Sequence, residues 1–93
     1  MQYTDKLKNA INTSHIIPKK QKPVLQVICK QKFPIPASEI EALLNLSRPS
    51  VNFSIHMLLN RGFIKRLKEG VFMYYPSEEK MKELIERYEL KTK

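Results

Sequence analysis

The stretch LSRPSVNFSIHMLLNRGFIKRLKEGVFMYY, Leu46 to Tyr75, decides the fold of this chain of 93 residues. Its second residue, Ser47, can cap a helix, and apolar residues then follow at helical spacing: Val51, Ile55, Leu58 and Leu59. Gly62 ends this pattern, and two β-prone runs, FIKRL and VFMYY, flank a tight turn that contains Gly70. The stretch therefore predicts a helix over residues 47 to 61 that leads directly into a β-hairpin.

A shorter helix is expected immediately before this stretch. Apolar residues at helical spacing run from Ile40 to Leu46, and Ser38 with Glu41 has the spacing of a capping box. Only two or three residues would then separate this helix from the next one. Two helices joined so closely are the sequence form of a helix-turn-helix.

Two further helices are expected in the N-terminal third of the chain. The first is capped by Thr4 or Asp5 and runs to about Asn12. The second begins near Lys20, because Pro23 is tolerated only in a first helical turn. These elements would complete the helical part that precedes the helix-turn-helix.

The remaining segments complete the predicted fold. FPIP at residues 33 to 36 is expected to be extended, since each proline also disfavours the α conformation of its predecessor. After Pro76, Ser77 can cap an amphipathic C-terminal helix. The fold class is therefore mainly α with a small β-hairpin wing, a winged helix-turn-helix of four to five helices. We expect one domain over residues 1–93, composed of an N-terminal helix (1–18), the winged core (19–76) and a C-terminal helix (77–93).

The charge of the chain indicates a polyanionic partner. Seventeen Lys and Arg against nine Asp and Glu give a net charge of +8, and the isoelectric point is near 9.8. The acidic and basic residues of the last seventeen positions balance, so the excess lies in the rest of the chain. We therefore expect the winged core, and not the C-terminal helix, to meet nucleic acid.

Several classes of function are disfavoured by the sequence. The longest apolar run, VFMYY, is too short to span a bilayer, and the N-terminus has no apolar signal-peptide core, so an intracellular, nucleoid-associated protein without membrane contact is expected. A single cysteine, Cys29, excludes an intrachain disulfide and reads as a buried, inert thiol. With no nucleophile motif, no glycine-rich phosphate loop and no cluster of metal ligands, we predict no enzyme activity, no cofactor and no metal.

The stretch from Leu46 to Tyr75 resembles the DNA-reading half of the ArsR-type winged-helix regulators. The resemblance covers roughly residues 20 to 76 and rests on Ser47, Val51, Ile55, Leu58, Gly62, Phe63, Ile64, Lys65, Arg66, Glu69, Gly70, Tyr74 and Tyr75. MarR-like and archaeal TrmB-like regulators share much of this pattern. The chain lacks the Cys-x-Cys pair of the metal-sensing members, and Asn52 and Ser54 replace a frequent Ser and His, so neither metal sensing nor base preference is implied.

This resemblance implies that residues 47 to 61 form the recognition helix and that residues 65 to 72 form the wing. The N-terminal, outward side chains of such a helix meet base edges in the major groove; here these are Arg48, Ser50, Asn52, Phe53 and His56. Arginine can pair with guanine, asparagine with adenine, and phenylalanine can contact a thymine methyl group. The residues expected at the DNA backbone are Ser47, Lys65, Arg66 and Lys68.

Dimerisation through the terminal helices is also implied, with Leu7, Ile11, Met81, Leu84, Ile85 and Tyr88 as the expected contact residues. Two recognition helices would then read half-sites about one DNA turn apart, as in a dimeric repressor. Any small-molecule effector is unknown.

Other readings of the same residues stay open at this stage. Phe53 and Met57 are four positions apart and could pack on another helix or a second subunit. The hairpin lysines could instead protect an exposed strand edge from pairing. The rival functions are a protein-interaction module and an architectural protein that binds nucleic acid without sequence preference.

Overall fold

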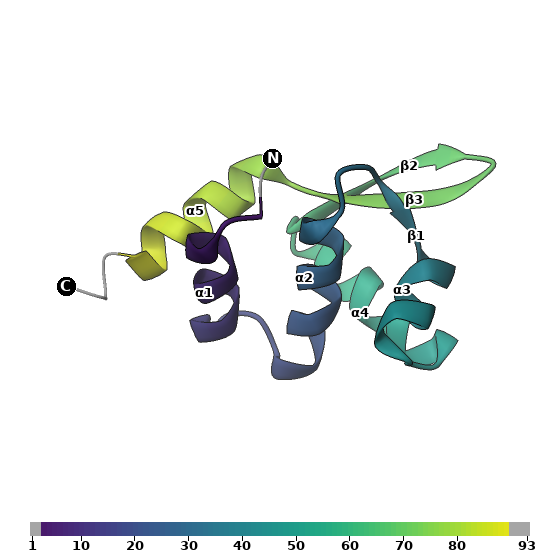
Figure 1. Ribbon diagram of the computed structural model, residues 1–93, viewed down its shortest axis with the longest axis horizontal. Coiled ribbons are helices and arrows are strands. Elements are labelled where there is room, and N and C mark those ends of the chain that lie inside the picture. Colours follow the sequence, from purple (N-terminus) through teal and green to yellow (C-terminus); the bar gives the residue numbers. More distant parts are fainter. Residues whose placement is uncertain (1–2, 90–93) are drawn as a thin grey trace.

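The computed structural model describes residues 3–89 and contains five α-helices, one 3₁₀ turn and one three-stranded sheet in this range (Figure 1). The elements follow one another in this order: α1 (Asp5–Thr13), η1 (Lys19–Gln21), α2 (Lys22–Lys30), β1 (Ile35–Pro36), α3 (Ala37–Leu44), α4 (Arg48–Asn60), β2 (Ile64–Glu69), β3 (Val71–Pro76) and α5 (Glu78–Glu89). This arrangement is a winged helix-turn-helix, which confirms the predicted fold class. Residues 1, 2 and 90–93 of the two expected terminal segments lie outside the described range.

The helix-turn-helix consists of α3 and α4, joined by the three residues 45–47. Asn45 adopts a left-handed conformation with φ of 53°, and the backbone N–H groups of Asn45 and Leu46 both donate to the carbonyl oxygen of Glu41. The helix therefore ends at Leu44, two residues earlier than the apolar pattern suggests.

The predicted capping box at the start of α3 is wrong. The helix begins at Ala37, Pro36 occupies the cap position, and no side chain accepts a hydrogen bond there. Pro36 is also the last residue of β1 and pairs with Met73 of β3. The chain passes directly from strand to helix, so Ser38 already lies inside the first turn and cannot cap it.

The wing is the antiparallel hairpin of β2 and β3, and β1 adds a third strand on the other side of β3. Ile35 of β1 pairs with Tyr74, and both side chains are buried. The segment expected only to be extended therefore ties the loop after α2 to the base of the wing. The outer part of the hairpin projects beyond the helices (Figure 1).

The helices pack around one continuous apolar core. Leu25 and Ile28 of α2, Ile40 of α3 and Val51 and Leu58 of α4 are almost fully buried in it. The helix α5 lies beside α1 at the opposite end of the molecule from the wing tip (Figure 1). The molecule is consequently elongated, with extents of 44 × 22 × 22 Å.

The predicted caps of α1 and α5 are confirmed. The Thr4 hydroxyl oxygen accepts a hydrogen bond from the Leu7 N–H at 3.2 Å, and the Ser77 hydroxyl oxygen accepts one from the Lys80 N–H at 3.3 Å. The second helix also begins as expected, with Pro23 in the first turn of α2 after the short turn η1. Local signals thus fix most of the helix starts.

Candidate nucleic-acid interface

The first turn of α4 is built by a serine cap and a proline. The Ser47 hydroxyl oxygen accepts a hydrogen bond from the Ser50 N–H at 3.3 Å, and the same hydroxyl donates to the Ser50 hydroxyl oxygen at 3.0 Å. Pro49 in this turn needs no N–H partner. Ser47 therefore already has a structural role, and the two hydroxyl groups stay exposed at the start of the helix.

The buried side of α4 carries Val51, Ser54, Ile55 and Leu58. All five residues predicted to contact bases lie outside this side and are exposed: Arg48, Ser50, Asn52, Phe53 and His56. The helix thus presents hydrogen-bonding side chains and one aromatic ring to the surroundings. Between Ser47 and Lys68 the sequence contains no Asp or Glu.

Phe53 is the most unusual of these side chains, because 64% of its surface is exposed. It borders a shallow hollow together with Leu44, Leu46 and Pro49, and Lys19 and Lys20 of η1 stand on the rim. No carboxylate lines this hollow. Phe53 is therefore left largely uncovered by the neighbouring elements of the same chain.

Arg48 is held in place by an acidic side chain of the preceding helix. Its Nε atom lies 3.3 Å from a carboxylate oxygen of Glu41, and its side chain remains 72% exposed. The pair is solvent-accessible, so it contributes little to stability. The guanidinium is nevertheless oriented, with its remaining N–H groups available to an external acceptor.

The strand register divides the cations of the wing between two faces. Arg66 pairs with Tyr74 and Lys68 pairs with Phe72, whereas Lys65 pairs with Tyr75 on the alternate face. Tyr74 is buried, as is Ile64 on the same face, so Arg66 and Lys68 continue the face that packs on the helical body. Sequence reasoning grouped the three cations, but only two of them share a side of the hairpin.

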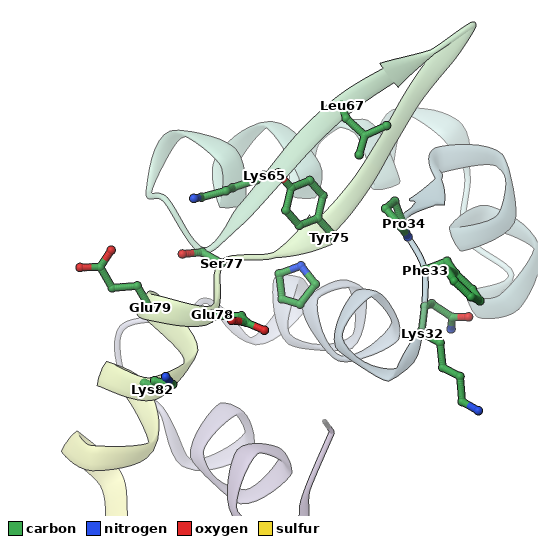
Figure 2. A pocket seen from close by; sticks show the side chains of 12 residues that line it. Lys32, Phe33, Pro34, Lys65, Leu67, Tyr75, Ser77, Glu78, Glu79 and Lys82 are labelled. Carbon is green, nitrogen blue, oxygen red and sulfur yellow. The ribbon is translucent and has the colours of Figure 1, made fainter. Parts of the chain in front are cut away.

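Lys65 instead lies beside Leu67 and Tyr75 on the other face of the hairpin (Figure 2). There it borders a pocket formed with the 31–34 loop and with the first turn of α5. None of the residues that line this pocket belongs to α3 or α4. Lys65 is thus placed differently from the other two cations of the wing, Arg66 and Lys68.

The residues predicted to form the subunit interface are mostly buried within the single chain. Leu7, Ile11, Met81, Leu84 and Tyr88 are no more than 6% exposed and belong to the core that joins α1 and α5. Ile85 is only partly buried. In this arrangement five of the six side chains stabilise the protomer itself.

The polar groups near α1 and α2 serve the protein's own structure. The Tyr88 hydroxyl accepts a hydrogen bond from the His15 backbone N–H at 2.9 Å, which ties α5 to the end of α1. Cys29 is 3% exposed, and burial raises the pKa of its thiol to about 12. The expected buried thiol is confirmed, and within residues 3–89 no three His, Cys, Asp or Glu side chains are grouped as a metal would require.

Two features at the ends of this surface were not among the residues singled out from the sequence. Arg61 follows the last turn of α4, with its guanidinium 5.5 Å from the centre of the Phe63 ring. Val71 and Phe72 at the wing tip are exposed. The length of the hairpin was the signal in the sequence for this exposure, because the outer residues of a long hairpin extend past the helices that could cover them.

None of the helices within residues 3–89 is both long and apolar enough to cross a membrane. No protein-family model matches the sequence, and no match is found among curated proteins. Several solved structures share the fold of this chain, at low sequence identity.

The ST1889 protein from the archaeon Sulfolobus tokodaii is 23% identical, with a TM-score of 0.65 over 96% of this chain and 93% of that one. A MarR-family transcriptional regulator from Rhodococcus sp. RHA1 is 16% identical, with a TM-score of 0.67 over 91% of this chain. Reduced HlyU from Vibrio cholerae is 18% identical, with a TM-score of 0.63, and the match covers 92% of this chain and 90% of that one. The chain spans only 61% of the Rhodococcus regulator. The helix-turn-helix and wing of this chain are thus the winged-helix fold that a MarR-family transcriptional regulator also has.

Proposed function

We propose that this protein is a transcriptional regulator that binds double-stranded DNA in a sequence-specific manner. In this proposal α4 lies in the major groove, and the hairpin contacts the backbone or the minor groove beside it. The similar structures support it at the level of fold, since regulators of the MarR family are among them. The placement of ArsR-like sequence features on α4 and the hairpin supports it at the level of residues.

One observation carries the proposal: the outward side of α4 is exposed, has no carboxylate, and presents several kinds of hydrogen-bonding and apolar side chain. Asn52 has the donor and acceptor that adenine requires, Arg48 can donate to guanine, and Phe53 can contact a thymine methyl group. A helix surface that served only solubility would carry acidic and basic residues in mixture. The side chains present are those that read bases.

Cations on either side of α4 would supply affinity. Arg66 and Lys68 lie on the hairpin face that continues toward the helices, and Lys19 and Lys20 lie beyond the start of α4. Contacts of such side chains with phosphates fix the position of a recognition helix without reading sequence. The net charge of +8 adds long-range attraction to DNA.

The proposed active form is a homodimer that acts as a repressor. Two copies would place two α4 helices on half-sites of a palindromic duplex. Because Met81, Leu84 and Tyr88 are buried in the protomer, the contact between copies would use the outer side of α5, where Ile85 is partly exposed, or would exchange α5 between copies. Occupying a promoter would suffice for repression without any further domain.

The hollow beside Phe53 favours one alternative function, a protein-interaction module. Leu44, Leu46 and Phe53 form an apolar surface, and Lys19 and Lys20 on its rim would pair with carboxylates. The partner would therefore be an acidic protein segment with an apolar side. Such a partner would compete with DNA for Phe53. The interaction module predicts that Phe53→Ala leaves nucleic-acid binding unchanged, whereas the proposed regulator predicts that it weakens this binding.

The test is selection from a randomised duplex library, followed by binding of the selected and a scrambled duplex. We expect the selected duplex to be palindromic and to bind at least about a thousandfold more tightly than scrambled DNA. Phe53→Ala should weaken binding of the winner, whereas Leu43→Ala should not, although Leu43 is 60% exposed on α3 and Phe53 is 64% exposed. Equal binding of both duplexes, unaffected by Phe53→Ala, would exclude sequence-specific recognition by α4.

A further inference from the structure

The tip of the wing exposes two large apolar side chains. Val71 is 60% exposed and Phe72 is 41% exposed, directly after the turn at Gly70. Gly70 has a φ of 80°, and no atom lies within 4 Å of the position that a Cβ would occupy there. The turn is therefore tight and faces open space, and the tip of the hairpin projects beyond the helices (Figure 1).

Two cations accompany the Phe72 ring. The Arg66 guanidinium lies 4.3 Å from the ring centre and the Lys68 ammonium lies 5.6 Å from it. All three side chains lie on one face of the hairpin, since Lys68 pairs with Phe72 and Arg66 with the next residue of that face. Val71 lies on the other face of the hairpin, where it pairs with Glu69, the single acidic residue of the tip.

Cation–π contacts do not account for the whole arrangement. They cover part of the Phe72 ring, but they leave Val71 exposed at the end of the turn. Apolar side chains on one strand of a hairpin whose other strand is basic match one feature of duplex DNA. In the minor groove, phosphates border a narrow channel whose floor is made of stacked base edges, and apolar side chains can wedge between those bases.

We propose that Phe72 and Val71, which point to opposite faces of the wing tip, insert together into the minor groove as an apolar wedge and bend the DNA there, while Arg66 and Lys68 contact the phosphates on the Phe72 side. This inference rests on the proposed function and deepens it, because it assigns a DNA-deforming role to the wing tip. Partial unstacking is easiest at pyrimidine–purine steps such as TA. The wing would thereby select flexible sites without forming hydrogen bonds to bases.

The experiment measures the bend in a duplex of about 30 base pairs with dyes at its two ends. One duplex carries TA steps in the flanks of the selected site, and the other has the same site with flanks that lack such steps. With wild-type protein, energy transfer between the dyes should report a bend of at least about 20° on the first duplex. Binding to the first duplex should be preferred by about fivefold or more.

The variant to compare carries Val71→Thr and Phe72→Thr, because threonine keeps the strand propensity of the hairpin and removes its apolar tip. It should bind both duplexes equally and leave them nearly straight. The control is Leu43→Gln, which removes an equally exposed apolar side chain from α3 and should bend DNA as the wild type does. Circular dichroism and thermal unfolding verify that each variant is folded.

The outcomes separate the two proposals. DNA that is bound but straight with wild-type protein, or a bend that persists in the double threonine variant, refutes the wedge and leaves the proposed function standing. Failure of wild-type protein to bind any duplex refutes the proposed function, and the wedge with it. Loss of the bend in the Leu43→Gln control as well would also refute a role specific to the wing tip.

Discussion

The division of the wing cations between two faces makes a quantitative prediction. Arg66 and Lys68 continue the face that packs on the helical body, whereas Lys65 borders a pocket on the other face (Figure 2). Each can be replaced by glutamine, which removes the charge and keeps much of the side-chain length. If α4 and the wing meet the same duplex, only the first two replacements remove phosphate contacts.

The magnitude follows from the release of counterions. Each phosphate contact on duplex DNA contributes about −0.9 to the slope of log binding constant against log salt. Replacing Arg66 and Lys68 together should therefore reduce the slope by about 1.8 and weaken binding by roughly 60-fold near 0.1 M salt. Each single replacement should cost about eightfold. Replacing Lys65 should leave the slope essentially unchanged.

The assay is a titration of one labelled duplex with each variant by fluorescence anisotropy, at four salt concentrations or more. Lys65→Gln is the matched control, since it alters the net charge of the protein by the same amount at a neighbouring position. A slope that falls equally in Lys65→Gln and Lys68→Gln would show that net charge alone matters. No change of slope in either variant would remove the wing from the interface.

Three further predictions concern the recognition helix and the core. Asn52→Ala should relax base selection at one position of the site and cost about 1 to 3 kcal/mol of discrimination, as measured by repeating the duplex selection with the variant. Leu84→Ala should lower the free energy of unfolding by about 2 to 5 kcal/mol, because this side chain is 2% exposed, while Ile85→Ala should cost less. Urea unfolding of both variants checks this, and a loss for Leu84→Ala no larger than that for Ile85→Ala would contradict burial of Leu84 in the protomer. Burial raises the pKa of the Cys29 thiol from 9.0 to about 12, so above about pH 9 the unfolded chain loses a proton that the folded protein keeps. The free energy of unfolding should therefore fall between pH 9 and 12, and the fall should be shallower in Cys29→Ala; equal pH dependence in both proteins would contradict this reasoning.

The structure also changes how the two ends of the molecule are interpreted. The sequence pattern of Met81, Leu84 and Tyr88 predicted an apolar face that a partner subunit would cover. In the folded chain α1 covers that face, since Leu7 and Ile11 are fully buried in the same core. Periodicity identifies a face that needs a partner, but it does not say whether the partner belongs to the same chain. Dimerisation thus remains a proposal.

Features governed by neighbouring residues could be predicted from the sequence. The helix α4 with its Ser47 cap, the turn at Gly70 and the cap at Ser77 all depend on interactions within a few positions. The outward position of Phe53 followed from helical geometry alone. Because these signals are local and agree with one another, the winged helix-turn-helix fold was determined by the sequence.

Features governed by residues far apart in the chain were decided only by the tertiary structure. Pairing of Ile35 with Tyr74 turned an extended segment into a third strand and moved the start of α3 away from Ser38. The register of β2 against β3 put Lys65 on one face and Arg66 on the other, and a shift of one residue would have reversed them. Such choices depend on contacts between distant segments, whose free energy no short window of sequence contains.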